Sequence, residues 1–148
     1  MKANELRIGN IVNISEDWYR RNPHLSKTPK QIIVDSINYD GLIGTSIYFA
    51  NGYEIEDDLD PIPITEEWLL RLGFEKNNQS YQVVYTINVE DEYEQDYTSK
   101  LYLGLDGQYF IGIPYELFRG KSKIQYVHQL QNLYFALTGE ELTIKEEK

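Results

Sequence analysis

Short alternations of apolar and polar residues dominate the first third of the chain and predict strands joined by tight turns. β-Branched residues fill 11–14 and 31–37, and turn signals occur at Asp40-Gly41 and Asn51-Gly52. Asn-Gly between apolar segments is the strongest short hairpin signal. Four or five such strands have the length and spacing of a small SH3-like β-barrel, which we predict for residues 1–60.

The next segment predicts a domain boundary followed by a helix. Pro61 and Pro63 stop a strand from continuing. A helix is predicted over 66–72, because Thr65 can cap its N-terminus and two glutamates in the first turn favour the positive end of the helix dipole. Gly73 is placed to end this helix in a left-handed conformation.

Three further strands are predicted over 81–89, 97–105 and 108–113, with Asp106-Gly107 as a hairpin turn. A longer helix follows over 123–137. The chain is therefore predicted to have an α+β fold. Its SH3-like barrel packs on a C-terminal unit of helix, three-stranded antiparallel sheet and helix, with domains 1–60 and 61–148.

The helical periodicity of 123–137 separates two stripes. Ser122 and Gln125 have the spacing of a capping box, and Gly139 is a stop signal. The core stripe contains Tyr126, Val127, Leu130, Leu133, Tyr134 and Leu137. The second stripe, a candidate interaction surface, contains Ile124, His128, Gln131 and Phe135. It packs either against the protein's own barrel or against a partner or a second copy of the chain, so it permits a homo-oligomer. The charged end, 143–148, is expected to fray.

The net charge of −10 is unevenly distributed. Residues 1–40 hold six Lys/Arg and five Asp/Glu, whereas 41–148 hold eight and nineteen. An acidic surface repels phosphate backbones, which disfavours general nucleic-acid binding. The acidity is explained either by a solubilising surface or by a surface that docks on a basic partner as a nucleic-acid mimic.

One concentrated basic stretch lies in the loop predicted between the first two strands. The aromatic and basic residues that could hold nucleic acid there are Trp18, Tyr19, Arg20, Arg21, Lys27 and Lys30. Stacking and phosphate contacts would be their chemistry. The alternative is a surface loop whose aromatic residues cover the end of the barrel.

The sequence predicts no catalytic, metal or cofactor site. There are no cysteines, and the two histidines, His24 and His128, have no partner at metal-binding spacing. No nucleophile elbow and no phosphate-binding glycine loop is present. We therefore predict a protein that is not an enzyme. The N-terminal residues predict no signal peptide, and no segment reaches the roughly 20 apolar residues of a membrane span, so a cytoplasmic location is expected.

Tyrosine is abundant, with 13 residues. The tyrosines of the second predicted sheet are Tyr81, Tyr85, Tyr93, Tyr97, Tyr102, Tyr109 and Tyr115. They serve either as cross-strand aromatic pairs or as a recognition surface for protein or sugar.

Three stretches, 1–10, 61–70 and 126–142, resemble an uncharacterised family of short proteins from gut anaerobic bacteria and their phages and mobile elements. The resemblance implies an intracellular accessory protein and carries no known activity. The leading hypothesis is a non-enzymatic protein-interaction or accessory module. The alternatives are a nucleic-acid-associated module acting through 18–30 and an acidic inhibitor of a basic host protein.

Overall fold

The structure is a computed structural model that describes residues 5–27, 29–37, 42–45, 48–54, 58–79, 82–89, 99–113, 116–120 and 123–145. The chain divides into two compact units, each described by itself below. Unit 1 comprises Met1–Ile62 with Tyr126–His128, and unit 2 comprises Pro63–Gln125 with Gln129–Lys148. Helices and antiparallel sheets occur together, which confirms the predicted α+β class. In the described residues no helix is long and apolar enough to cross a membrane.

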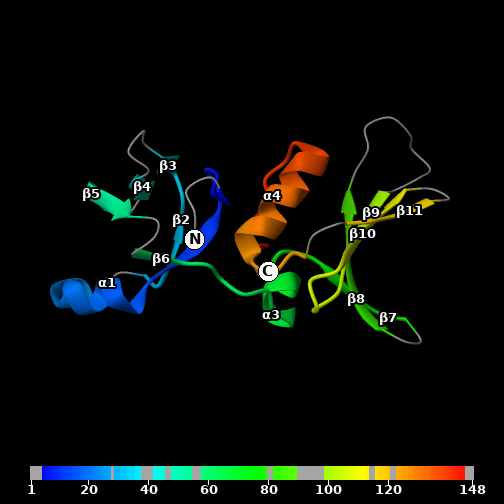
Figure 1. Ribbon diagram of the computed structural model, residues 1–148, viewed down its shortest axis with the longest axis horizontal. Coiled ribbons are helices and arrows are strands. Elements are labelled where there is room, and N and C mark those ends of the chain that lie inside the picture. Colours follow the sequence, from blue (N-terminus) through cyan, green and yellow to red (C-terminus); the bar gives the residue numbers. More distant parts are fainter. Residues whose placement is uncertain are drawn as a thin grey trace. The chain divides into compact units, whose positions relative to one another are not determined.

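Unit 1 is built mainly from short strands. Its elements are β1 (Ile11–Ile14), α1 (Glu16–Arg21), the 3₁₀ helix η2 (Pro23–Leu25), β2 (Gln31–Ile33), β3 (Ser36–Ile37), β4 (Leu42–Thr45), β5 (Tyr48–Glu54) and β6 (Leu59–Asp60). They form two three-stranded antiparallel sheets, in the orders β2-β1-β6 and β3-β4-β5 (Figure 1). Because β2 and β3 belong to different sheets, the described strands close no barrel. The SH3-like barrel predicted for 1–60 is therefore not confirmed.

Two local predictions in unit 1 are wrong. The stretch expected to be a loop contains α1, because the Ser15 hydroxyl accepts a hydrogen bond from the Trp18 amide and so caps a helix. The Asn51-Gly52 turn is absent, and both residues lie inside β5. There β5 pairs with β4 from Leu42–Glu54 to Thr45–Tyr48. The register shifts between Ile43 and Thr45, so Asn51 and Gly52 lie at an irregular point of this pairing.

The core of unit 1 lies on one face of the β2-β1-β6 sheet. Val12 of β1 is opposite Ile32 of β2, and both are buried. Residues two apart on a strand share a face, which places Ile14 beside Val12. The buried cluster is completed by Leu6, Trp18, Val34 and Leu59. Trp18 thus anchors α1 to the sheet.

Unit 2 is a five-stranded antiparallel sheet with two helices. Its elements are α3 (Glu66–Arg71), β7 (Glu75–Gln79), β8 (Gln82–Val89), β9 (Ser99–Leu103), β10 (Tyr109–Ile113), β11 (Glu116–Arg119) and α4 (Val127–Thr138), whose first two residues belong to unit 1. The strand order is β11-β10-β9-β8-β7. The three predicted strands and the β9–β10 hairpin are confirmed. β7 and β11 were not predicted, since polar residues fill β7 and β11 is only four residues long.

The helix α3 begins and ends as its sequence predicts. The Thr65 hydroxyl accepts a hydrogen bond from the Trp68 amide. At the other end, Gly73 has φ +87°, its amide donates to the Leu70 carbonyl, and the Phe74 amide donates to the Leu69 carbonyl. These two bonds form a Schellman motif. The left-handed glycine turns the chain so that β7 begins two residues later.

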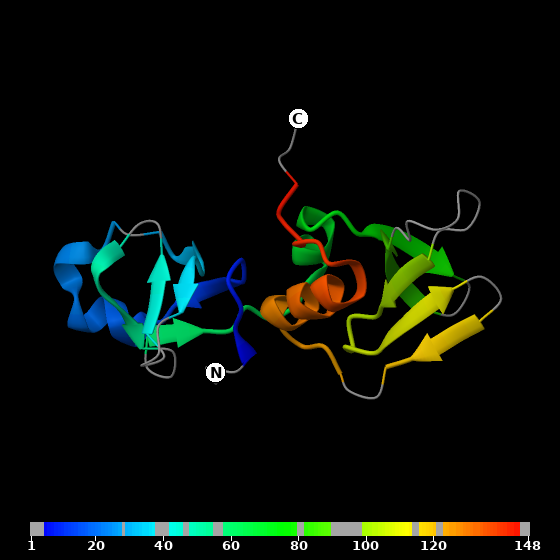
Figure 2. The ribbon, with the colours of Figure 1, turned by 90° about the horizontal axis from the view of Figure 1, so that it is seen from above.

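Helices α3 and α4 lie on the same side of the five-stranded sheet (Figures 1 and 2). Tyr85, Leu101 and Leu103 of the sheet are fully buried. In the register Tyr85 is opposite Leu103, which keeps these side chains on one face. Leu69 of α3 and Leu130 of α4 are also fully buried. These residues form the core of unit 2.

The helix α4 begins at Val127, four residues later than predicted. The preceding residues, 124 and 125, form backbone hydrogen bonds with distant segments and are not part of the helix. The Ile124 amide donates to the Gly107 carbonyl, and the Gln125 carbonyl accepts from the Ile64 amide. The predicted capping box includes Ser122, which lies outside the described residues. The predicted stop at Gly139 is confirmed, with φ +75°.

Leu69 and Leu70 provide a test of the core assignment, because adjacent residues of α3 differ in exposure. Leu69 is 0% exposed and Leu70 is 48% exposed. Leu69→Ala is expected to lower the free energy of unfolding by about 2–5 kcal/mol, through lost burial and a residual cavity. Leu70→Ala is expected to change it by less than about 1 kcal/mol. Urea denaturation of both variants measures the difference, and equal losses would contradict the described packing.

Candidate functional site

A polar cleft of about 480 Å³ opens at one end of the unit 2 sheet. We call it the β8 cleft. Its lining comes from the end of α3, the start of β7, the middle of β8, the last turns of α4 and the segment after α4. The lining residues are Leu72, Gly73, Glu75, Thr86, Ile87, Asn88, Tyr134, Thr138, Glu140, Glu141, Leu142, Thr143 and Lys145. This volume is in the range of sites that bind small molecules or side chains.

Gly73 shapes the floor of the cleft. A Cβ added there would collide with the side chain of Lys145, and the left-handed φ already disfavours other residues. The absence of a side chain lets the aliphatic part of Lys145 lie across the end of α3. The chain after α4 can therefore approach α3 closely.

Hydrogen bonds hold the segment after α4 as the second wall. The Gln131 side-chain amide donates to the Leu142 carbonyl at 3.0 Å, and this contact is buried. The Lys145 amide donates to the Arg71 carbonyl at 2.9 Å. The expectation that 143–148 frays is therefore wrong for Lys145, while 146–148 lie outside the described residues.

The edge of β8 forms the third side of the cleft. β7 begins at Glu75, which is opposite Thr86, so β8 continues beyond its neighbour. On the other side, β9 pairs with β8 as far as Val89. Within the described part of the chain, residues 87–89 are thus paired with β9 alone. An edge of this kind offers backbone donors and acceptors to an added strand.

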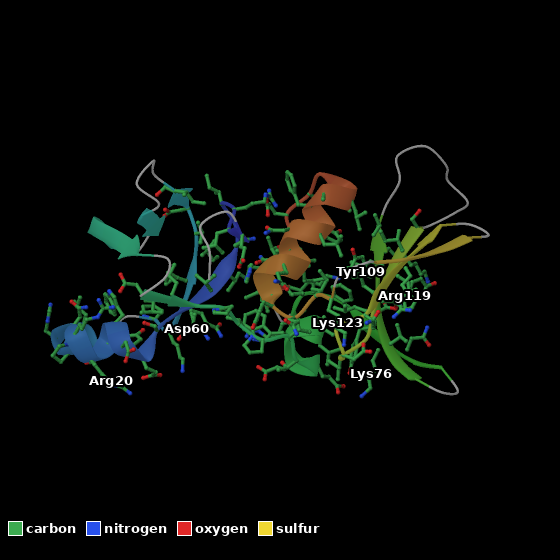
Figure 3. The ribbon with its side chains drawn as sticks, in the orientation of Figure 1. Arg20, Asp60, Lys76, Tyr109, Arg119 and Lys123 are labelled. Atoms are coloured by element: carbon green, nitrogen blue, oxygen red, sulfur yellow. The ribbon has the colours of Figure 1, made fainter. Side chains whose placement is uncertain are left out.

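An ion pair ties α3 to the sheet beside the cleft. Glu66 Oε1 accepts from Lys76 Nζ at 2.7 Å, and Lys76 is labelled in Figure 3. The hydrogen bond from Lys76 holds the pKa of Glu66 below its ordinary value. The Tyr85 side chain is buried, and its hydroxyl lies near the Glu66 carboxylate. Burial and the charge of Glu66 raise the pKa of Tyr85. Both effects keep this tyrosine neutral, in keeping with a packing role.

Most of the predicted nucleic-acid residues are engaged within unit 1. Arg20 extends outward from α1 and pairs with Asp17 at 2.7 Å (Figure 3). Lys30 pairs with Glu16 at 3.2 Å, and Arg21 pairs with the mostly buried Asp58. Each pair cancels one positive charge locally, which reduces the attraction for phosphate.

The two aromatic residues of that stretch pack against the core. Trp18 is buried, and Tyr19 contacts its ring edge-on while donating its hydroxyl hydrogen to the Pro29 carbonyl. Neither ring is presented as a flat platform for a base. Lys27 is exposed and forms no ion pair within the described ranges.

The predicted stripe on α4 is mostly buried. Ile124, His128 and Gln131 are 8% exposed or less, and Phe135 is half-buried. Gln131 serves to hold the segment after α4. Exposed large apolar side chains lie elsewhere and are separated along the chain, with Ile8, Ile33, Leu70 and Leu105 the most exposed. Scattered apolar residues of this kind are ordinary for a protein surface.

His128 is buried without a hydrogen bond to either ring nitrogen. Its ring stacks on Tyr126, with 5.8 Å between centroids and 6° between planes. Burial lowers the pKa of His128, and the Glu5 carboxylate opposes this effect in part. The imidazole is therefore kept neutral at pH 7.

The tyrosine-rich sheet is described only in part. Tyr85 is a core residue, and Tyr102 and Tyr109 are half-buried. The Tyr102 ring lies over Gly112, and the Tyr109 ring lies over Gly120. These contacts fit packing across strands. The predictions for Tyr81, Tyr93, Tyr97 and Tyr115 fall outside the described residues.

The sequence analysis did not identify the β8 cleft. Its residues come from three separate stretches of sequence, within 72–75, 86–88 and 134–145, and no single stretch carries a motif. Of the residues described, no group of three or more histidines and carboxylates is placed to hold a metal ion. Compared with known proteins, the chain matches no family model, no curated protein and no solved structure.

The buried His128 predicts a pH dependence of stability. Unfolded His128 binds a proton below its ordinary pKa of about 6.5, whereas the folded state resists protonation. The free energy of unfolding is therefore expected to fall as the pH drops from 7.5 to 5.5, by up to about 1.4 kcal/mol per pH unit below 6.5. Urea denaturation across this range should show a smaller fall in His128→Gln. The matched variant His24→Gln, at an exposed position, should keep the wild-type dependence. Identical pH profiles for wild type and His128→Gln would contradict this account.

Proposed function

We propose that the protein is a non-enzymatic protein-interaction module, an accessory protein of a phage or mobile element, and that its partner binds in the β8 cleft. The observation that carries the proposal is that residues 87–89 of β8 pair with β9 alone among the described strands, while Ile87 and Asn88 line an open polar cleft. Proteins commonly bind an extended segment of a partner by adding it as a strand to such an edge. The phage or mobile-element context is supported by the resemblance of three stretches of the sequence.

The composition of the cleft favours binding over catalysis. Neither histidine of the chain lines it. Its polar groups are carboxylates, hydroxyls, an amide and one ammonium group, which suit recognition by hydrogen bonds and charge. Arg20 and Arg21 of α1 are engaged in ion pairs, so fewer positive charges are available to bind phosphate. This gives less support to the alternative of a nucleic-acid-associated module.

Site-specific cross-linking tests this proposal. A photoreactive phenylalanine analogue is placed at Asn88, an exposed residue of the cleft. The matched control carries it at Arg20, which is exposed on α1. Irradiation in a lysate of the native host, with and without nuclease, should cross-link a protein to position 88 that survives nuclease. Excess unlabelled wild-type protein should compete it away.

The control position separates the alternatives. The same protein cross-linked equally from position 20 would show contact without specificity for the cleft and would contradict the proposal. Nucleic acid cross-linked at position 20 and lost on nuclease treatment would instead support the nucleic-acid alternative.

A further inference from the structure

Acidic residues dominate the charge of the β8 cleft. Glu75, Glu140 and Glu141 line it against one cation, Lys145. Glu75 and Glu140 form no ion pair within the described parts of the chain. Unpaired carboxylates around a concave surface concentrate negative potential and attract cations. This sign agrees with the net charge of −10 on the whole chain.

A buried hydroxyl adds to the acceptors of the cleft. Thr86 is 7% exposed and lines the cleft, and its hydroxyl has no hydrogen-bond partner among the described residues. Thr86 is opposite Glu75 in the register, so both side chains lie on the same face of the sheet. A hydroxyl both donates and accepts, whereas a carboxylate only accepts, so a donor that bonds to Glu75 can also be accepted by the Thr86 hydroxyl beside it.

The chain itself shows that a lysine side chain fits here. The methylene groups of Lys145 lie against Gly73, at a distance that leaves no room for a Cβ. The ammonium group is left without an ion pair in the described residues. Lysine methylenes cover apolar surface while the charged end stays in a polar environment. A second cationic side chain, from a partner, could place its methylene groups and its charged end in the same way.

We propose that the β8 cleft binds an extended basic segment of a partner protein. The segment adds along residues 87–89 of β8, and a lysine or arginine of the segment donates hydrogen bonds to Glu75, Glu140 and Thr86. This inference rests on the proposed function and names the chemistry of the partner. Strand addition supplies affinity through the backbone, and the carboxylates supply specificity for positive charge.

Three synthetic hexapeptides serve as probes: alternating Lys-Thr, alternating Gln-Thr and alternating Glu-Thr. They share length and extended character and differ in charge. Each is titrated into isotope-labelled protein, and amide chemical shifts report binding. The Lys-Thr peptide is expected to shift the amides of 86–88 and 140–145. Its affinity should fall severalfold between low salt and about 0.3 M salt, because the charges are partly exposed.

Charge variants test which residues recognise the peptide. Glu75→Gln combined with Glu140→Gln is expected to weaken binding of the Lys-Thr peptide about tenfold or more. The matched control, Glu67→Gln with Asp60→Asn, removes the same charge at exposed positions outside the cleft and should weaken it less than threefold. Lys145→Met keeps the side-chain volume, removes the competing cation and should strengthen binding severalfold. Dispersed amide spectra establish that each variant is folded.

The outcomes separate this inference from the proposed function. Equal binding of the Lys-Thr and Gln-Thr peptides at the cleft would overturn the basic segment and leave the cleft as an interaction site. Equal weakening by the two double variants would also overturn it, because long-range charge alone would explain the effect. If the Lys-Thr peptide does not bind while position 88 still cross-links to a protein, the inference fails and the proposed function stands.

Discussion

The left-handed turn at Gly73 is the constraint on which the described features of unit 2 depend. It ends α3, starts β7 two residues later and leaves the space that Lys145 crosses. Any side chain at this position would meet both a strained backbone and the Lys145 methylenes. The Lys145 amide also donates to the Arg71 carbonyl, which holds the segment after α4 beside the end of α3. The β8 cleft lies where these segments meet β8.

The cleft is also a consequence of unequal strand lengths. β8 has eight residues and β7 has five, and their pairing ends at Glu75 and Thr86. The extra residues of β8 are supported by β9 on one side. Sheets usually protect such an edge, because it recruits other chains. Here the segment after α4 lines the same cleft as Ile87 and Asn88 of β8 and contributes two carboxylates to it.

Charge is used differently in the two units. In unit 1, Arg20 and Lys30 pair with nearby carboxylates, and Arg21 pairs with the mostly buried Asp58. In unit 2 the carboxylates of the cleft outnumber its cation. Spacing along the chain does not show which charges of the basic stretch are paired, because the pairing with Asp58 joins residues far apart in the sequence.

Local rules determined much of this structure. The cap at Thr65, the stop at Gly73, the stop at Gly139 and the β9–β10 hairpin follow from short sequence signals, since each depends on hydrogen bonds within a few residues. Alternating apolar residues likewise identified β8. Such features could be predicted because their energies are local.

Tertiary structure decided the rest, through pairings that no local pattern contains. Asn51-Gly52 lies inside β5, at the point where the register with β4 shifts, and residues 124 and 125 lie outside the helix, where their backbone groups bond to Gly107 and Ile64. The polar strand β7 exists because β8 offers it an edge. The β8 cleft gathers three stretches of the sequence, within 72–75, 86–88 and 134–145. Its chemistry is present in the composition, but its geometry depends on contacts between residues that only the folded chain brings together.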